Sequence, residues 1–404
     1  MLIEFKFKNV FSFKEEARIL MTAVKSFKEL TDTNIIATDR GFDLLKTAAI
    51  YGANGSGKSN FIAAFGLFHH IIFNSFRDSL AKENERRRQF NQFRLNTASM
   101  KENSMFEISF IHDQFIYRYG FEIFGYIIKK EWLYRKQERE ILLFNRDLQE
   151  FEVNKESFAE AQKYKEEVNE NVLLLSHLAQ YNQPVSKHVL GWLQNAIGIN
   201  GLNDRVEHTA TLLSRDQNFK LLAAAILRYL EISNIEAGEK DGEVVTYHKR
   251  YDENNLLVDA IPFEADIESV GTRKLIGLLG PIYFTLHNGG VLFVDEFDSK
   301  LHPNLTRKLL TLFQEVNLKN AQIIFTAQDV TLLDKKLLRR DQIWFVEKNQ
   351  FGASELYSMS EFSSDVVRNT SDFAAKYLNN VFGGADTVEL TKKIKDLLYG
   401  SKGE

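Results

Sequence analysis

The sequence predicts an α/β fold, in which mixed and antiparallel sheets surround a core built on a glycine-rich loop and a helical lobe is inserted. Three observations lead to this prediction. A short apolar run breaks into glycine-rich sequence at residue 52 and then resumes as an amphipathic helix. Apolar and polar residues alternate with period two from Met105 to about Val153. In the last third of the chain, helical segments alternate with apolar strands, which is typical of a parallel sheet.

The first elements are strands, because residues 2–8 and 17–22 alternate apolar and polar side chains as in an exposed-edge sheet. Residues 46–51 form a short apolar strand ahead of the glycine-rich loop. The helix that opens at Ser59 has a wide apolar face, made by Phe61, Ile62, Phe65, Phe68, Ile72 and Phe73. Residues 76–92 are charged, and we expect a helix with an exposed outer face.

The middle of the chain changes character twice. Residues 105–153 predict a meander of antiparallel strands with turns at HD, FG and NRD. Residues 155–202 are rich in Glu, Lys and Gln and predict helices, interrupted by a proline. Helical signal returns at 216–231, and two more strands are expected at 244–249 and 256–263.

The last third repeats helix and strand. The expected elements, in order, are helix 272–287, strand 290–294, helix 304–317, strand 322–326 and strand 342–346. With 404 residues the chain is too long for one ordinary compact core, and no internal repeat is visible. We therefore expect three parts. Residues 1–154 and 241–404 would form the two halves of one sheet-containing lobe, and residues 155–240 would be an inserted helical lobe.

Composition restricts the classes of protein. The absence of cysteine excludes disulfides and Cys-based zinc or redox sites, and it fits a reducing cytoplasm. The start, MLIEFKFKNV, has no basic region followed by an apolar one, so we expect no signal peptide. The best candidate for a membrane span, residues 61–73, contains two histidines and is better explained as a buried helix. These features predict a cytoplasmic protein without a membrane partner.

Charge argues against broad contact with DNA. The formal net charge is −4, whereas proteins that depend on non-specific DNA contact are usually basic. A local DNA surface stays open as an alternative on two basic clusters. Their members are Arg86, Arg87 and Arg88 in one, and Lys129, Lys130, Arg135, Lys136 and Arg139 in the other. The simpler interpretation of both clusters is a solvated face interleaved with glutamate.

A phosphate-binding loop is predicted where the apolar strand meets the helix. Residues 52–59 fit the pattern G-x-x-x-x-G-K-[ST], whose backbone amides and following helix terminus face phosphate oxygens. Lys58 would bridge the β- and γ-phosphates, and the Ser59 hydroxyl would coordinate Mg²⁺. The predicted ATP-binding residues are Gly52, Ala53, Asn54, Gly55, Ser56, Gly57, Lys58, Ser59 and Asn60. The alternative is a glycine-rich turn that binds no nucleotide.

An acidic pair supports this prediction. The apolar run Val291-Leu292-Phe293-Val294 ends in Asp295 and Glu296. Asp295 would hold Mg²⁺ opposite Ser59, and Glu296 would orient and deprotonate the attacking water. Such a pair is common by itself and indicates a nucleotide site only together with the phosphate-binding loop. ATP hydrolysis with Mg²⁺ is therefore the predicted chemistry.

A serine–glycine turn precedes that strand. Ser269, Gly271 and Thr272 stand at the start of the expected helix, and such a turn can bind phosphate. Because residues 52–59 already enclose one nucleotide's phosphates, we expect this turn to contact the γ-phosphate held by a second copy of the chain. The alternative is an ordinary helix N-cap at Ser269.

Together these motifs resemble the ATP-binding-cassette ATPases of the structural-maintenance (SMC), Rad-fifty and RecF type. The segments LIEFKFKNVFSFKEEARILMTA and RRDQIWFVEKNQFGASELYSMSEF are similar to the bacterial abortive-infection ATPases of the AbiLi/RloA group, relatives of the overcoming-lysogenization-defect (OLD) family. The resemblance covers both ends of the chain. It implies an ABC-ATPase head, with nucleotide at the interface of a homodimer or a higher homo-oligomer.

The resemblance also assigns individual residues. It implies that residues 269–272 are the signature turn acting in trans and that residues 298–302 line the dimer interface. Gln328 occupies the switch position, where such ATPases usually carry histidine, and glutamine cannot become cationic. Phe11 stands where relatives often carry a basic residue near the nucleotide. Gln92 is our candidate for the glutamine that senses Mg²⁺.

What the chain lacks separates it from the larger relatives. The interval between Lys58 and Ser269 is too short for the long coiled-coil arms of chromosome-maintenance proteins, and without cysteine there is no zinc hook. The residues after Gln328 are too few for a fused Toprim nuclease. The resemblance therefore implies a separate effector protein, of nuclease or Toprim type.

Three functions follow as hypotheses. The first is a sensor ATPase in an anti-phage (abortive infection) system that controls the separate toxic effector. The second is a RecF-like DNA-repair ATPase that contacts duplex backbone through the basic clusters. The third is a scaffold that binds ATP and turns it over slowly, which the glutamine at position 328 motivates.

Overall fold

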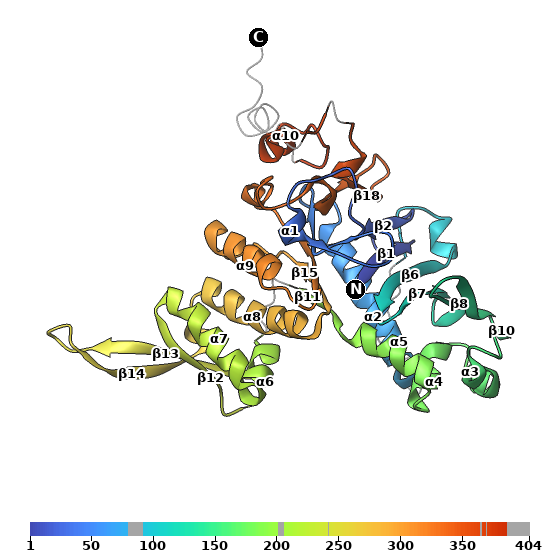
Figure 1. Cartoon of the computed structure of the whole chain (residues 1–404), viewed down its shortest axis with the longest axis horizontal. Coiled ribbons are helices and arrows are strands. Elements are labelled where there is room, and N and C mark those ends of the chain that lie inside the picture. Colours follow the sequence, from blue (N-terminus) through green and yellow to red (C-terminus); the bar gives the residue numbers. More distant parts are fainter. Residues whose placement is uncertain (80–91, 201–205, 241, 364–365, 369, 386–404) are drawn as a thin grey trace, which may run out of the picture.

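The computed structural model describes residues 1–79, 92–200, 206–240, 242–363, 366–368 and 370–385 (Figure 1). Most of the expected helix over 76–92 and the arginines at 86–88 therefore lie outside the described residues. The chain folds into an antiparallel sheet, a mixed sheet, helices that pack on both, and a projecting hairpin.

The antiparallel sheet has the strand order β10-β9-β8-β7-β6-β1-β2. Its strands are β1 (Leu2–Lys8), β2 (Ala17–Leu20), β6 (Ser104–His112), β7 (Phe115–Phe124), β8 (Ile127–Lys136), β9 (Glu140–Asp147) and β10 (Glu150–Val153). The predicted meander is confirmed, since each strand from β6 to β10 pairs with the next. The basic cluster at 129–139 lies on β8 and the turn after it, where Lys130 pairs with Glu122 at 3.8 Å.

The mixed sheet has the order β11-β15-β16-β5-β17-β18. Its strands are β5 (Thr47–Tyr51), β11 (Ala196–Asn200), β15 (Val291–Asp295), β16 (Gln322–Thr326), β17 (Ile343–Lys348) and β18 (Ser354–Ser358). All neighbours are parallel except β17 and β18. The predicted fold class is confirmed: a mixed and an antiparallel sheet are present, and the glycine-rich loop follows β5 of the mixed sheet.

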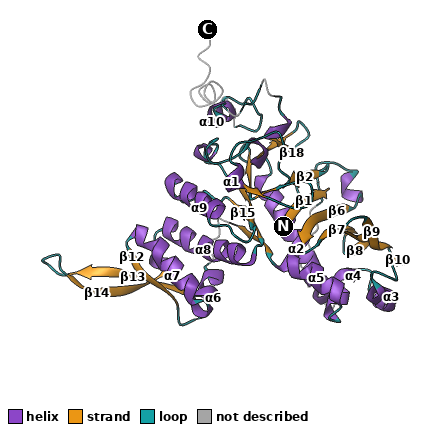
Figure 2. Ribbon diagram, viewed as in Figure 1, coloured by secondary structure: helices purple, strands orange, loops and turns teal. Residues whose placement is uncertain are grey.

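The helices are α1 (Thr31–Asn34), α2 (Lys58–Ser79), α3 (Ala159–Tyr164), α4 (Leu174–Gln180), α5 (Pro184–Gln194), α6 (Glu207–Arg215), α7 (Gln217–Leu227), α8 (Val270–Asn288), α9 (Pro303–Glu315) and α10 (Phe373–Leu378). A short ladder joins β3 (Ile35–Ile36) to β4 (Leu44–Leu45). A further antiparallel sheet contains β12 (Ile232–Ala237), β13 (Val244–Tyr251) and β14 (Leu257–Glu264). Its β13–β14 hairpin extends away from the body (Figures 1 and 2).

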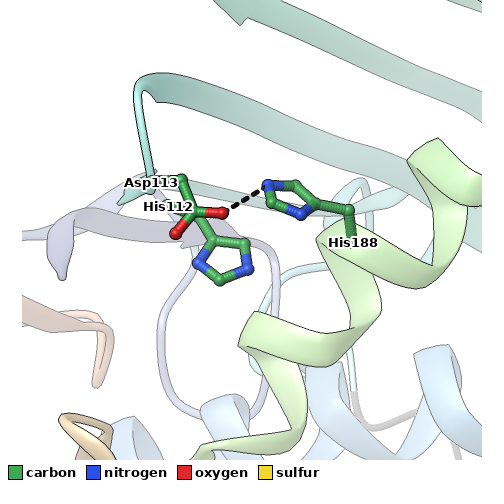
Figure 3. A group of neighbouring side chains, drawn as sticks. All are labelled: His112, Asp113 and His188. Atoms are coloured by element: carbon green, nitrogen blue, oxygen red, sulfur yellow. Dashed lines mark ion pairs between the residues drawn. The ribbon is translucent and has the colours of Figure 1, made fainter.

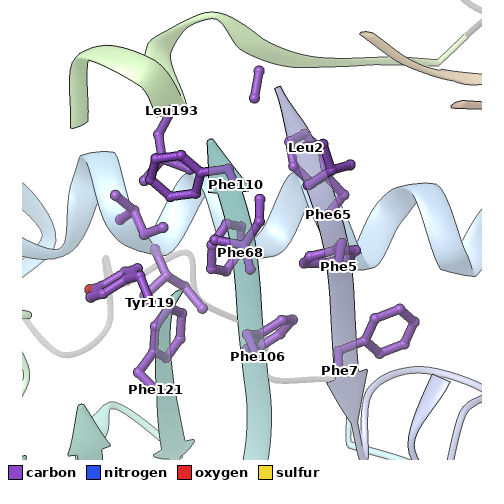
Figure 4. Packing of buried hydrophobic residues seen from close by; sticks show 14 of the residues in the cluster. Leu2, Phe5, Phe7, Phe65, Phe68, Phe106, Phe110, Tyr119, Phe121 and Leu193 are labelled. Atoms are coloured by element: carbon purple, nitrogen blue, oxygen red, sulfur yellow. The ribbon is translucent and has the colours of Figure 1, made fainter. Parts of the chain in front are cut away.

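Helix α2 is the central element, because it lies between the two sheets. Its Phe68 ring stacks on Phe121 of the antiparallel sheet, with centroids 5.8 Å apart, and its Phe65 ring stacks on Phe293 of β15 at 3.7 Å. Figure 4 shows Phe65, Phe68 and Phe121 with Phe5 and Phe106 in one buried cluster. The wide apolar face predicted from sequence thus packs against both sheets. This packing fixes the position of α2.

The strands of the mixed sheet bury both faces. Along β5, Ala48 and Ile50 join the core on the α2 side, whereas Ala49 and Tyr51 join the core on the side of α8 and α9. Alternate residues of a strand point to opposite faces, so a nearly continuous apolar run is required here. This burial holds the strand ends rigidly.

The interval 155–240, proposed from sequence as an inserted helical lobe, contributes to both cores. Helices α4 and α5 pack in the core beneath the antiparallel sheet (Figure 2), whereas α6 and α7 pack in the core of α8. Between them, β11 joins the mixed sheet beside β15, which composition did not predict. The boundaries at residues 155 and 240 stay a proposal, but the interval is not purely helical.

Candidate active site

The phosphate loop, residues 52–59, connects β5 to α2 at the carboxyl edge of the mixed sheet. Two glycines are required by geometry. A Cβ on Gly52 would lie 2.3 Å from the carbonyl oxygen of Val346, and a Cβ on Gly57 would lie 2.3 Å from Ser354 Oγ. Gly57 also has a backbone φ of 119°, which residues other than glycine rarely adopt. The loop is therefore tight, as phosphate binding requires.

The lysine of the loop folds back over it. Lys58 Nζ donates hydrogen bonds to the carbonyl oxygens of Gly52 at 2.5 Å and Ala53 at 3.1 Å, and the residue is buried. Lys58 is the first residue of the 22-residue helix α2, whose amino end carries a partial positive charge. Ser59, the next residue, is exposed. The cationic and hydroxyl groups expected at a triphosphate thus stand at one helix terminus.

Two serines that sequence analysis did not single out hold the loop. Ser354 Oγ, on β18, donates to the carbonyl of Ser56 at 2.5 Å and contacts Ser12 Oγ at 2.8 Å. The side chain of Asn60 donates to the same Ser12 hydroxyl at 2.9 Å. The turn containing Ser12 also contains Phe11, which packs against the apolar core and has φ of 52°. Long-range serine contacts leave no local sequence signal.

The acidic pair lies at the end of β15, and β16 supplies its support. The hydroxyl of Thr326 donates to Asp295 Oδ1 at 2.6 Å and accepts from the backbone N–H of Glu296 at 2.7 Å. Strand register explains this geometry, because Val294 lies opposite Phe325 in neighbouring parallel strands. One buried hydroxyl therefore sets the orientation of the first carboxylate and the backbone of the second.

Glu296 leaves the strand in a strained conformation. Its φ is 48°, in the left-handed region that non-glycine residues seldom occupy, and such strain concentrates at functional sites. The backbone carbonyl of Glu296 accepts a hydrogen bond from Lys274 Nζ at 2.9 Å, and Lys274 is buried on α8. The helix that follows the serine–glycine turn is thereby linked directly to the acidic pair.

The signature turn, residues 269–272, begins α8. Ser269 is the N-cap, and its Oγ accepts from the backbone N–H of Thr272 at 3.1 Å. The N-cap interpretation is therefore realised in this chain, and it does not conflict with a second role toward phosphate. A Cβ on Gly271 would lie 3.0 Å from the carbonyl of Lys300, so the turn packs against the segment that follows the acidic pair.

The switch position is joined to that same segment. Asp298 Oδ2 accepts from the backbone N–H groups of Gln328 at 2.8 Å and Asp329 at 2.5 Å, and Gln328 is exposed. The hydroxyl of Tyr51, at the end of β5, donates to the carbonyl of Asp329 at 3.1 Å. Burial raises the pKa of Tyr51 well above its usual value, and the carboxylates of Asp298 and Asp329 raise it further, so this phenol stays a neutral donor.

Gln92 is hydrogen-bonded to the loop before β6. Its amide donates to the carbonyl of Glu102 at 2.5 Å. Within the described residues, no hydrogen bond joins Gln92 to Ser59 or Asp295, so its role as a magnesium sensor stays a prediction.

In the part of the chain that the structure describes, no helix is both long and apolar enough to cross a membrane.

No curated protein sequence matches the chain. Two solved structures resemble it at 13% identity. The "SMC head domain from Thermotoga maritima" has a TM-score of 0.41, with 88% of this chain and 98% of that chain covered. An SMC head bound to the C-winged helix domain of ScpA has a TM-score of 0.39, with 89% and 99% covered.

A family model matches residues 48–334, an interval that runs from β5 through the acidic pair to just beyond the switch position. The family is described as "AAA domain, putative AbiEii toxin, Type IV TA system". The matched interval covers more than half of the chain and contains the phosphate loop, the signature turn and β15. The chain therefore belongs to this family of AAA domains.

Proposed function

We propose that this chain binds ATP with Mg²⁺ and hydrolyses it. The observation that carries the proposal is the convergence of three parallel strands at one edge of the mixed sheet. β5 leads into the phosphate loop, β15 ends at Asp295, and β16 ends at Thr326. In open α/β sheets, ligands bind at the carboxyl ends of strands. The chemistry required for a metal-bound triphosphate is thus brought to one place.

The residues of the phosphate loop fit a triphosphate. Ser56 Oγ is enclosed and has no hydrogen-bond partner within the described part of the chain. Its hydroxyl would therefore be free to donate to a phosphate oxygen bound in the loop. Lys58 would exchange the carbonyls of Gly52 and Ala53 for β- and γ-phosphate oxygens. The backbone amides of the loop and the amino end of α2 would stabilise the remaining phosphate charge.

The two residues of the acidic pair would have different roles, metal binding for Asp295 and proton transfer for Glu296. The Ser59 hydroxyl and the Asp295 carboxylate would hold Mg²⁺, which supplies charge neutralisation of the phosphates when bound. Glu296 would orient the attacking water and accept its proton. Gln328 would donate a hydrogen bond toward the γ-phosphate. Because glutamine stays neutral, we expect slower turnover than with a cationic switch residue.

A second copy would complete each site through its signature turn. Apolar side chains are exposed on both surfaces that would meet. Beside the signature turn, Ile267 and Val270 are 68% and 43% exposed. Beside the phosphate loop, Leu95 and Phe351 are 71% and 72% exposed, on the loops that adjoin Ser354. These exposed apolar side chains would be covered when the two copies meet.

Mixing two inactive variants tests the shared site. Lys58→Ala removes phosphate contact but keeps the signature turn, whereas Ser269→Arg blocks the turn but keeps the phosphate loop. A mixed dimer contains one site with both intact parts. We expect the mixture to hydrolyse ATP faster than either variant alone, measured as phosphate release. A mixture no faster than the separate variants would contradict the shared site.

We further propose that the ATPase is the sensor subunit of an anti-phage system and controls a separate toxic effector. The family description, which names a putative AbiEii toxin and a type IV TA system, and the resemblance to abortive-infection ATPases support this proposal. Cells that carry the full operon test it. Lys58→Ala and Glu296→Gln are each expected to abolish protection from phage, and plaque counts measure it. Full protection by both variants would end the proposal.

A further inference from the structure

A group of ligand-type side chains lies far along the sequence from the phosphate loop, where the β6–β7 turn meets α5. His112 ends β6, Asp113 occupies the turn with φ of 50°, and His188 comes from the middle of α5 (Figure 3). One ligand atom from each of the three lies within 4.8 Å of the others. None of the three is used by the proposed ATPase site.

The contacts within this group leave a nitrogen without a partner. His188 Nε2 lies 3.8 Å from Asp113 Oδ2, which is too long for a hydrogen bond. That nitrogen is enclosed and has no hydrogen-bond partner among the described residues. The two imidazole rings stack, with centroids 4.1 Å apart and an interplanar angle of 30°. The unpartnered His188 Nε2 therefore lies beside the Asp113 carboxylate, whose side chain is exposed.

Packing alone explains only part of this arrangement. Two residues earlier on β6 and four residues later on α5, Phe110 stacks on Trp192 with centroids 4.0 Å apart. The histidine stack continues that row, so two aromatic rings here are what the helix–sheet contact requires. Packing does not require titratable rings, and it does not require a carboxylate beside the unpartnered nitrogen.

We propose that His112, Asp113 and His188 bind a divalent transition-metal ion of the zinc type. Two imidazoles and one carboxylate suit Zn²⁺ and its neighbours, whereas Mg²⁺ and Ca²⁺ prefer oxygen ligands. Metal–ligand bonds of about 2.1 Å in a tetrahedron place ligand atoms about 3.4 Å apart. Closing the group from 4.8 Å would require the three side chains to turn toward one another, and Asp113 lies in an exposed turn.

A bound ion would fasten α5 to the β6–β7 turn. Since α5 leads directly into β11, the neighbour of β15, the ion would stabilise the edge of the mixed sheet.

Cobalt titration of the untagged, nucleotide-free chain tests the proposal, because Co²⁺ replaces Zn²⁺ and reports its coordination by visible absorption. His188→Phe keeps a ring for stacking and removes a ligand. Asp113→Asn keeps a residue that tolerates positive φ and removes the carboxylate. His70→Ala is the control, since His70 pairs with Asp78 at 3.3 Å outside the group.

We expect one Co²⁺ per chain with four-coordinate absorption, affinity reduced at least about tenfold in both ligand variants, and no change in the control. Zn²⁺ should raise the melting temperature of the wild type and the control but of neither ligand variant, since an ion that binds only the folded state stabilises it. Ion bound at Asp295 would not respond to His188→Phe. Absence of binding, or equal affinity in wild type and both ligand variants, would overturn the proposal.

Discussion

The hydroxyl of Thr326 illustrates how much a single residue can organise. It donates to Asp295 and accepts from the backbone of Glu296, so it orients the proposed metal ligand and the proposed base at the same time. Thr326 is fully buried, and a buried donor or acceptor left without its partner costs about 1–3 kcal/mol. The hydroxyl is therefore a positioning group for the proposed hydrolysis.

Replacing Thr326 by valine should slow hydrolysis and leave ATP binding nearly intact. The substitution keeps the branched shape but removes the hydroxyl. A loss of about 1–3 kcal/mol from the arrangement of the acidic pair corresponds to a turnover reduced about 5- to 150-fold. Steady-state kinetics and a fluorescent-nucleotide titration measure the two effects. Thr326→Ser, which restores the hydroxyl, should recover most of the rate, and a serine variant as slow as valine would refute the assignment.

At the scale of elements, α8 connects the signature turn to the acidic pair. Its N-cap is Ser269, and one turn later the buried Lys274 donates to the carbonyl of Glu296, whose backbone is strained. A helix moves as a unit, so displacement of the signature turn by a second copy would be transmitted to Glu296. The contact would provide a physical route from the proposed dimer to the proposed hydrolysis.

Lys274→Met should uncouple the proposed dimer formation from the proposed hydrolysis. Methionine matches the apolar part of the lysine side chain but cannot donate to the carbonyl of Glu296. We expect turnover to fall about tenfold or more while ATP affinity, which depends on the phosphate loop, is preserved. Lys308→Met, an exposed change on α9, is the control. Unchanged turnover in the Lys274 variant, with the protein folded, would show that the contact has no part in the reaction.

At the scale of the whole molecule, polar contacts join residues 24–29 to residues 339–341, which are more than 300 positions apart in the sequence. The Arg339 guanidinium donates to the carbonyls of Phe27 and Glu29, and it pairs with Asp341, whose carboxylate accepts from the backbone of Val24. Nearby, Arg340 pairs with Glu29 at 2.9 Å and lies over the Phe27 ring. These contacts join the segment before the phosphate loop to the segment before β17.

The pair Glu29–Arg340 makes part of the stability depend on pH. Burial raises the pKa of Glu29, but the hydrogen bond from Arg340, a backbone hydrogen bond and the charges of Arg340 and Arg339 together bring the pKa below its usual 4.5. A carboxyl group with a lowered folded-state pKa stabilises the fold above its unfolded-state pKa, and this contribution is lost as pH falls through the folded-state value. The affected window therefore lies below about pH 4.5.

Denaturant unfolding of Glu29→Gln across pH tests this expectation. The variant should be less stable than wild type at neutral pH, and the difference should shrink as pH falls below 4.5. Glu15→Gln, which changes a carboxylate that is 67% exposed, is the control and should show no such trend. A stability difference that stays constant with pH would mean that the ion pair does not act as proposed.

The sequence by itself determined the elements with local signals. The phosphate loop, β5 and α2 were predictable because a backbone that cradles phosphate needs glycines at defined spacing, and because the helix needs its apolar face. The antiparallel meander followed from period-two alternation, and β15 with its acidic pair followed from a short apolar run. Each of these signals is contained within a few consecutive residues.

Tertiary structure alone decided how these pieces are joined. Strand β11 was not predicted, because its short segment carries a mixed pattern and becomes a strand only by pairing with β15. The roles of Ser354, Thr326 and Lys274 depend on partners tens or hundreds of residues away. The approach of His188 to His112 likewise depends on how α5 packs on β6. Local periodicity encodes which face of an element is apolar, but contacts between distant segments arise only once those faces have packed together.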